Sequence, residues 1–195
     1  MMFINHMYKN MDKKISTSII LIIIVLVVWG SYLIYQSTTE QSHINFVEQK
    51  PTVDARNVTY IIEGEEITLV NGRAEKEVLP GSASKIITQY FGNEVKADFN
   101  VDGMDDVAFL LTQDSGGTGT FYYLAVALWT ENGYKGTNAI FLGDRIAPQT
   151  TEFKNGEIIV NYADRKAGES MVVIPSVGIS KYFKVVDGGL VETKK

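Results

Sequence analysis

The chain has 195 residues, a formal net charge of −5, 45% hydrophobic and 21% charged residues, and 17 glycines, a composition typical of a folded protein with many turns. The absence of cysteine excludes disulfides, thiolate catalysis, zinc-thiolate sites and a lipid-modified cysteine anchor. Both histidines, His6 and His43, precede the region expected to fold, which excludes a Ser-His-Asp triad, a His-ligated zinc and a histidine general base from that region.

Residues 15–35 are expected to form a transmembrane helix. No side chain from residue 16 to residue 39 is charged, and residues 19–28 are an unbroken run of Ile, Leu and Val. As a helix, residues 15–35 would be roughly 31 Å long, which matches the hydrocarbon thickness of a bilayer. Aromatic side chains that suit the headgroup region lie at the C-terminal end of the segment: Trp29, Tyr32 and Tyr35.

Basic residues on the N-terminal flank set the orientation of this helix. Three lysines precede it, Lys9, Lys13 and Lys14, and no base follows it before Lys50. The positive-inside rule makes residues 1–14 a cytoplasmic tail and puts the C-terminal part outside the cytoplasmic (plasma) membrane. A cleaved signal peptide is the alternative, but residues 31–39 contain no A-x-A-like site and the apolar stretch is long, which favours an uncleaved signal anchor.

Residues 36–56 are expected to be a flexible stalk, because they are polar, nearly patternless and include Pro51. An extracytoplasmic globular domain then occupies residues 57–195. This domain is more acidic than the whole chain, since the first 36 residues contain three lysines and a single acidic residue, Asp12. An acidic domain repels phosphate backbones, which argues against nucleic acid as a partner and favours divalent cations.

Tight-turn dipeptides and β-rich runs predict an antiparallel sheet. Residues 58–63 and 66–70 form a hairpin signal around Gly64-Glu65, and Asn71-Gly72 supplies a second tight turn. Further strands are expected at residues 107–113, 120–129, 137–142, 150–154, 157–162, 179–186 and about 190–192. Three hairpin dipeptides join several of these strands: Asn132-Gly133, Asn155-Gly156 and Asp187-Gly188.

One segment between the strands has the pattern of a helix. Residues 81–92 (GSASKIITQYFG) place Ile86, Ile87 and Tyr90 on one helical face. Ser82 or Ser84 would cap the N-terminus of this helix, and Gly92 would end it. The predicted fold class is therefore α+β: a mostly antiparallel β domain with one short helix, preceded by the transmembrane helix.

One loop carries a metal-binding pattern. Residues 98–106 (DFNVDGMDD) fit D-x-N-x-D-G-x-x-D and precede a strong strand signal. Alternate residues of a tight loop face a common centre, and hard oxygen donors with a carboxylate majority favour calcium. The predicted ligands are the side chains of Asp98, Asn100, Asp102 and Asp106 and the backbone carbonyl of Met104. The alternative interpretation is an Asp- and Asn-rich turn without metal.

This loop resembles the calcium loops of EF-hands and dockerins, and more closely those of FG-GAP repeats, in which the same spacing runs directly into a β-strand. It departs from the EF-hand at position 12, where Phe109 replaces the glutamate. The resemblance covers about a dozen residues and implies a weakly bound, structural calcium ion. The whole layout, an N-terminal anchor followed by GSASK, GTFYY and LGDRIAPQTTE, resembles small uncharacterised single-pass proteins of uncultured bacteria, a resemblance that implies no activity.

Weaker signals have ordinary structural interpretations beside functional ones. Residues 114–119 (DSGGTG) are Gly-rich but lack the lysine of a P-loop, which favours a hairpin loop. Four aromatic residues would make a sugar-stacking platform if exposed, although alternating aromatics of a strand usually belong to the core: Phe121, Tyr122, Tyr123 and Trp129. Asp144-Arg145 and Asp164-Arg165, with Glu152 or Glu157, would supply carboxylates for glycoside chemistry, and solvated ion pairs are the alternative.

These features predict a non-enzymatic, extracytoplasmic binding or envelope-interaction module that acts on a protein or a glycan at the cell surface. A carboxylate-dependent hydrolase of the cell envelope is the alternative. It would require two paired carboxylates in an acidic cleft.

Overall fold

A computed structural model of the chain describes residues 26–32 and 53–194. The chain divides into two compact units, residues 1–49 and residues 50–195. Residues 26–32, inside the predicted transmembrane segment, are helical, whereas residues 15–25 and 33–35, the predicted cytoplasmic tail and most of the predicted stalk lie outside the described residues. Within the two described ranges, no helix has the length and apolar character needed to cross a membrane.

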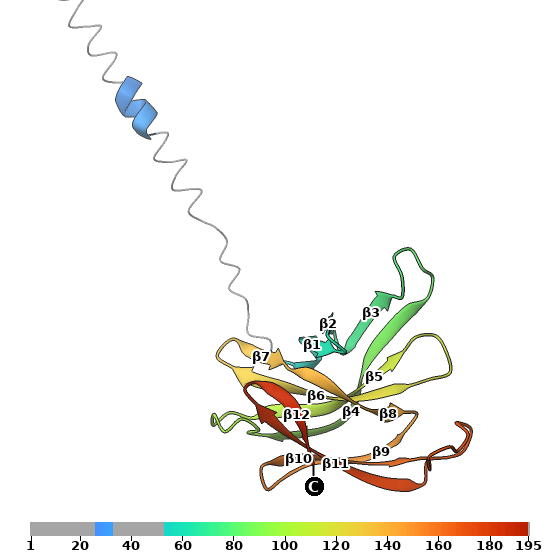
Figure 1. The fold of residues 1–195 in the computed structure, drawn as a ribbon. Coiled ribbons are helices and arrows are strands. Elements are labelled where there is room, and N and C mark those ends of the chain that lie inside the picture. Colours follow the sequence, from blue (N-terminus) through green and yellow to red (C-terminus); the bar gives the residue numbers. More distant parts are fainter. Residues whose placement is uncertain (1–25, 33–52, 195) are drawn as a thin grey trace, which may run out of the picture. The chain divides into compact units, whose positions relative to one another are not determined.

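Residues 53–194 fold into a β domain (Figure 1). A 3₁₀ turn at Ala55–Asn57 precedes the first strand. The strands are β1 (Thr59–Ile62), β2 (Glu65–Thr68), β3 (Arg73–Glu77), β4 (Lys85–Ala97), β5 (Asp106–Asp114), β6 (Phe121–Thr130), β7 (Gly133–Gly136), β8 (Asn138–Asp144), β9 (Ala147–Lys154), β10 (Glu157–Asp164), β11 (Val177–Val186) and β12 (Gly189–Thr193).

The strands form two sheets. The large sheet has the order β2-β1-β8-β6-β5-β4-β3, with β7 also paired to β6, and the small sheet has the order β12-β11-β10-β9. Every neighbouring pair is antiparallel except β1 and β8, which are parallel. The expectation of a mostly antiparallel β domain is confirmed.

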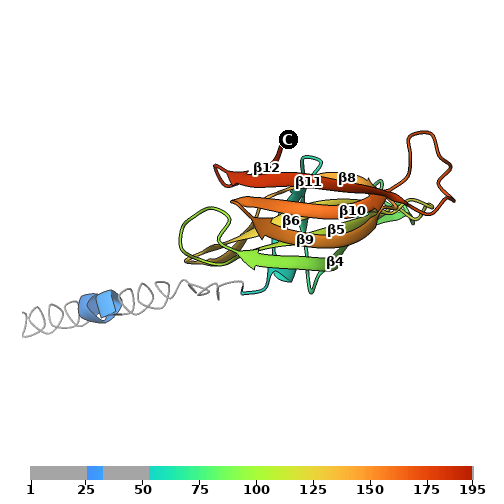
Figure 2. The same cartoon turned by 90° about the horizontal axis from the view of Figure 1, so that it is seen from below.

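Two apolar cores lie on opposite faces of the large sheet. β5 and β6 are buried on both faces, so alternate side chains of each strand enter different cores, as Leu110 and Leu111 do. The first core is shared with the small sheet, which lies against the large sheet (Figures 1 and 2), and includes Leu124, Val160 and Phe183. The second core lies under the β1–β2 hairpin and includes Tyr60 and Phe109.

Three of the predicted turn dipeptides have positive φ at both residues, whereas at Asn132-Gly133 only Gly133 has it (φ 95°). Asn71, Asn155 and Asp187 have φ values of 51°, 55° and 51°, and the glycine that follows each also has positive φ. Positive φ at both central residues is what a type I′ turn requires. The β1–β2 turn is centred on Glu63-Gly64, one residue earlier than expected.

The helix predicted at residues 81–92 is wrong, because this segment contains the start of β4. Thr88 is buried, and the strand pairs with β3 on one side and with β5 on the other. β-Branched Ile86, Ile87 and Thr88 suit a strand, and Gly92 (φ 106°) marks an irregularity in the pairing with β5 instead of a helix end. In the described domain the short helical element is the 3₁₀ turn at Ala55–Asn57.

The strand registers show that the following connections lie at two opposite ends of the domain. The proximal end, on the left in Figure 1, carries the loop at residues 98–105, the turns at 131–132 and 187–188, and the start of β1. The distal end carries the connections at residues 78–84, 115–120, 145–146 and 165–176. Candidate sites occur at both ends.

Candidate functional site

The loop predicted to bind calcium is held together by its own side chains. Asp98 accepts hydrogen bonds from the backbone N–H groups of Asp102 (3.1 Å) and Gly103 (2.8 Å). Asn100 accepts from the Asp102 N–H (3.2 Å) and donates its amide to the Asp102 carboxylate (2.7 Å). Carboxylate and amide oxygens have two lone pairs each, so these oxygens keep the capacity to coordinate a cation.

Asp106 has a different role from the other predicted ligands. Its side chain is fully buried, and its two oxygens accept hydrogen bonds from the N–H groups of Phe99 (3.0 Å) and Trp129 (2.8 Å). Burial raises the pKa of Asp106, although the two N–H bonds act in the opposite direction. Asp106 therefore ties both ends of the loop to β6, and each of its oxygens already accepts one hydrogen bond.

A metal site built from acidic side chains alone is not present in the described part of the chain. There, no three or more His, Cys, Asp or Glu side chains lie together in a way that would hold a metal ion. The predicted donor set also includes the amide of Asn100 and the carbonyl of Met104, which are not acidic groups. The calcium site stays a prediction.

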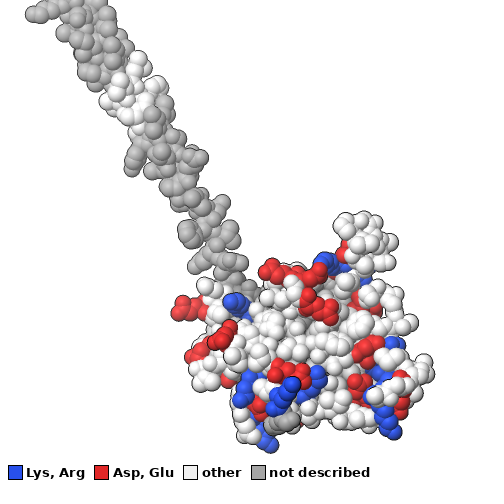
Figure 3. Space-filling model, viewed as in Figure 1, with Lys and Arg blue, Asp and Glu red and all other residues white. Residues whose placement is uncertain are grey.

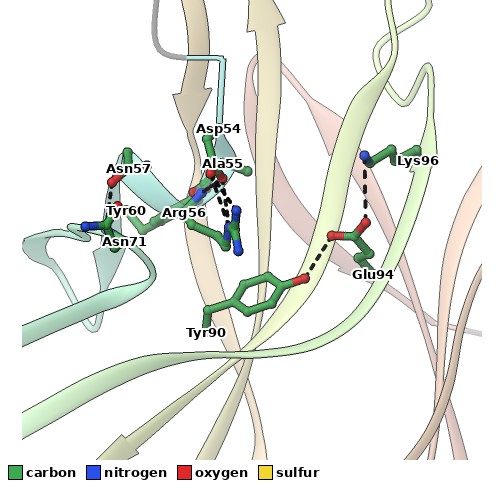
Figure 4. A network of polar contacts seen from close by, with 9 residues as sticks. All are labelled: Asp54, Ala55, Arg56, Asn57, Tyr60, Asn71, Tyr90, Glu94 and Lys96. Atoms are coloured by element: carbon green, nitrogen blue, oxygen red, sulfur yellow. Dashed lines mark hydrogen bonds and ion pairs between the residues drawn. The ribbon is translucent and has the colours of Figure 1, made fainter.

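Sequence reasoning missed a polar hollow at the proximal end (Figure 4). Asp54 caps the 3₁₀ turn and binds the Arg56 guanidinium through both oxygens, with the shorter contact at 2.8 Å. These hydrogen bonds from Arg56 hold the pKa of Asp54 below its usual range. Across the hollow of about 590 Å³, the Tyr90 hydroxyl donates to Glu94 (2.8 Å), which also pairs with Lys96.

This network attaches the first residues of the domain to the large sheet. The Tyr60 hydroxyl donates to the Ala55 carbonyl (2.7 Å), and the Gly72 N–H donates to the Arg56 carbonyl (2.8 Å). Burial and the bond to Glu94 raise the pKa of Tyr90 to about 12. Ala55 is buried in the second core, so ordered packing begins before the expected domain boundary at residue 57.

The two Asp-Arg pairs predicted from the sequence meet at the distal end. Arg165 donates from its guanidinium to the Arg145 carbonyl (3.0 Å), and a Cβ added at Gly143 would lie 3.7 Å from an Asp164 oxygen. Partial burial would raise the pKa of Asp144, but the hydrogen bonds from Arg145 and the Thr120 N–H dominate and lower it.

The second carboxylates proposed for glycoside chemistry do not join this cluster. Glu152 lies opposite Ile159 near the C-terminal end of β9, the edge strand of the small sheet, and Glu157 lies at the end of β10 away from Asp164. Each makes its own hydrogen bond, with Thr150 and Thr193 respectively.

The predicted aromatic platform is divided among three places. Phe121 and Tyr123 face the second core, whereas Tyr122 lies on the opposite face, with its ring 5.2 Å from that of Phe91. Trp129 contacts Tyr134 near the proximal end. Strand alternation separates Tyr122 from its two neighbours, because adjacent residues of β6 point to opposite faces, and Trp129 is separated by its position at the other end of the strand.

Phe121 and Tyr123 form an aromatic hollow with a residue that sequence reasoning did not select. The Phe141 ring on β8 lies 5.5 Å from that of Tyr123 and 6.3 Å from that of Phe121. We call the resulting cavity of about 330 Å³ the distal hollow; its lining residues are Glu63, Ile86, Gln113, Ser115, Phe121, Tyr123 and Phe141. The spacing of Phe121 and Tyr123 in the sequence predicts that both rings lie on one face of the strand. The strand order of the sheet is what brings Phe141 beside them.

Comparison with known proteins gives no relative: no protein-family model matches the chain, and no curated protein or solved structure matches it significantly.

Proposed function

We propose that this chain is a membrane-anchored, extracytoplasmic binding module that acts on a protein or glycan at the cell surface. The observation that carries the proposal is the distal hollow, where an aromatic side chain remains exposed on an otherwise packed face of the large sheet. Phe141 is 45% exposed and stands beside two other rings. Concave sites lined by aromatic residues and a few polar groups are the usual form of binding sites.

Two carboxylates of the described domain, Asp144 and Asp106, support a binding role better than the alternative, a hydrolase. A general acid for glycoside cleavage needs a raised pKa and access to the substrate. The pKa of Asp144 is lowered, and Asp106, whose pKa is raised, is fully buried with both oxygens bonded to backbone N–H groups. Neither side chain meets both requirements.

Residues 15–35 supply the proposed anchor, and the proposed topology has an inner N-terminus and an outer domain. This part rests on the apolar run and on the three N-terminal lysines. Protease added to intact cells should release the domain by cutting between residues 36 and 52. A domain that stays protected until the cells are lysed would overturn the topology.

We further propose that one calcium ion stabilises the loop at residues 98–106. Asp98, Asn100 and Asp102 would contribute side-chain oxygens, Met104 its carbonyl, and Asp106 a remaining lone pair. The ion would offset the repulsion among the carboxylates and cross-link a domain that has no disulfide.

Thermal unfolding tests the calcium proposal. The domain should melt several degrees higher in millimolar calcium than in chelator, and Asp98→Ala with Asp102→Ala should abolish the difference. Asp105→Asn is the control, since Asp105 is exposed and is not a predicted ligand. Equal melting temperatures of the unchanged domain with and without calcium would rule the ion out.

The binding role itself is tested by sedimentation with isolated envelopes of the producing cells. Residues 50–195 form the compact unit that contains both cores, so this fragment should co-sediment saturably. A fragment that stays in the supernatant at every concentration would contradict the proposal.

A further inference from the structure

We propose that the distal hollow binds the side chain of a lysine or arginine from an extended, basic segment of a partner protein. The inference rests on the proposed binding function and names the chemistry of the partner. It is carried by three properties of the hollow: aromatic walls, acceptor oxygens with no hydrogen-bond partner among the described residues, and an acidic group that forms no ion pair with a described base.

The aromatic walls are held in place by strand pairing. Phe121 and Tyr123 lie two residues apart on β6, and Phe141 is the register partner of Tyr123 on β8. β8 pairs with β1 only as far as Ala139, so Phe141 lies at an edge and keeps 45% of its surface exposed. A ring that is fixed by its neighbours and open on one side offers its face to a ligand, and an aromatic face attracts a cation.

Two polar side chains of the hollow, Glu63 and Gln113, present acceptor oxygens. The Tyr123 hydroxyl donates to Glu63 Oε1 (2.9 Å), and the Gln113 amide donates to Thr88 Oγ1 (3.0 Å). Among the described residues, neither Glu63 Oε2 nor Gln113 Oε1 takes part in a hydrogen bond. The hollow therefore presents a carboxylate oxygen and an amide oxygen to a donor, which an ammonium or a guanidinium group supplies.

Charge complementarity selects a cation over a neutral sugar or an anion. Glu63 forms no ion pair with a described base, whereas its neighbour Glu65 is paired with Lys76. Figure 3 shows further acidic side chains over the β1–β2 hairpin, and the chain as a whole is acidic. A neutral sugar would use the rings but leave the charge of Glu63 uncompensated, and an anion would be repelled by it.

The shape of the site suits an extended segment. A second hollow of about 300 Å³ shares Glu63, Ile86 and Gln113 with the first and continues along β2 to Ile67. Glu65 and Lys76 also line it, and they are paired with each other, so the lysine does not compensate the charge of Glu63. An extended peptide presents successive side chains to opposite sides at a fixed spacing. One segment can therefore place a basic side chain among the rings and lay its backbone along the neighbouring hollow.

Fluorescence anisotropy tests the inference on the full-length chain, purified in a neutral detergent. The probe is a fluorescein-labelled octapeptide of alternating lysine and glycine, and the control peptide has norleucine in place of lysine. The lysine peptide should bind at least about tenfold more tightly than the norleucine peptide, because only the ammonium group gains the contacts with Glu63 and the rings. Equal binding of the two peptides would overturn the proposal.

Matched variants separate the site from general attraction to an acidic protein. Glu63→Gln and Phe141→Ala should each weaken lysine-peptide binding by about fivefold or more, in line with a lost charge-assisted bond or cation–π contact. Glu66→Gln removes the same charge from an exposed position on the same hairpin, and Phe91→Ala removes a ring that is 47% exposed on the opposite face. If these controls weaken binding as much as the site variants do, the proposal is wrong.

The peptide-binding test and the co-sedimentation test can fail independently of each other. If the lysine peptide fails to bind while the domain still co-sediments with cell envelopes, the basic partner is refuted and the binding module stands. Loss of both would refute the module as well.

Discussion

Asp106 gives the sharpest stability prediction, because its carboxylate joins the loop at residues 98–105 to β6. Asp106→Asn keeps the size of the side chain but replaces one acceptor oxygen by an NH₂ group. In the unchanged domain the N–H groups of Phe99 and Trp129 donate to the Asp106 oxygens, at 3.0 Å and 2.8 Å. The NH₂ group would face one of these two N–H groups. One buried N–H would lose its partner.

The expected cost follows from that lost bond. A hydrogen bond to a charged group contributes about 1.5–3 kcal/mol, and an unsatisfied buried donor costs about 1–3 kcal/mol. Burial disfavours the charged form of Asp106 and raises its pKa, so removing the charge offsets part of the lost stability. We therefore expect Asp106→Asn to lower the free energy of unfolding by about 2 kcal/mol, and Asp106→Ala, which orphans both N–H groups, to lower it further.

Urea unfolding of residues 50–195 in chelator measures this effect without any contribution from calcium. Trp129 is the only tryptophan in that fragment, so its fluorescence reports unfolding next to the bond in question. Asp105→Asn makes the same chemical change at the preceding, exposed position and should stay within about 0.5 kcal/mol of the unchanged domain. An Asp106→Asn domain as stable as the Asp105→Asn control would refute the reasoning.

Three further changes test the packing and the charges of the domain. Gly136→Ala should lower the free energy of unfolding by about 2 kcal/mol or more, because the added Cβ would overlap the Thr59 carbonyl oxygen and approach the Tyr60 ring. The control is Gly178→Ala, on a strand with open space around the Cβ. Equal urea midpoints for the two variants would contradict this packing. Val101→Gly should raise the free energy of unfolding by about 0.5–1 kcal/mol, because Val101 is 89% exposed and a β-branched residue is strained at its φ of 63°; a fall in the melting temperature would argue against strain at this position. The pKa of Asp144 is lowered in the fold, so its charge stabilises the folded state above the ordinary Asp pKa of about 3.9 and this contribution is lost as the pH falls through the lower, folded value. The stability gap between the unchanged domain and Asp144→Asn should therefore be larger at pH 7 than at pH 3, and a gap that does not depend on pH would exclude this linkage.

The proposed binding surface and the loop at residues 98–105 lie at opposite ends of one β domain. The proximal end holds the loop at residues 98–105 and the polar network around Asp54 and Arg56. The distal end holds the hollow lined by Phe141 and, beyond it, an uncharged loop at residues 78–84 (Figure 3). The proposed binding surface therefore lies away from the point at which the chain enters the domain.

Local chemistry explains what the sequence determined by itself. Asn71-Gly72, Asn155-Gly156 and Asp187-Gly188 tolerate positive φ, so each dipeptide defines a tight turn without help from distant residues, and the last two join paired strands. The apolar runs of β5 and β6 were recognisable for a similar reason, since a strand that is buried on both faces needs apolar residues at consecutive positions, as at residues 107–111 and 123–128. The grouping of Asp98, Asn100 and Asp102 in one loop is also local, and they are in fact linked by hydrogen bonds.

Tertiary structure decided what depends on pairing between distant strands. Residues 85–92 have an amphipathic pattern that fits a helix, but hydrogen bonds to β3 and β5 and the burial of Thr88 hold them in a strand. Likewise, Phe141 meets Tyr123, and Glu63 receives the Tyr123 hydroxyl, only because β1, β8 and β6 lie side by side in the sheet. Turns and buried runs are fixed by neighbours in the chain, whereas strand order is set by the free energy of forming two cores at once, which no short stretch of sequence contains.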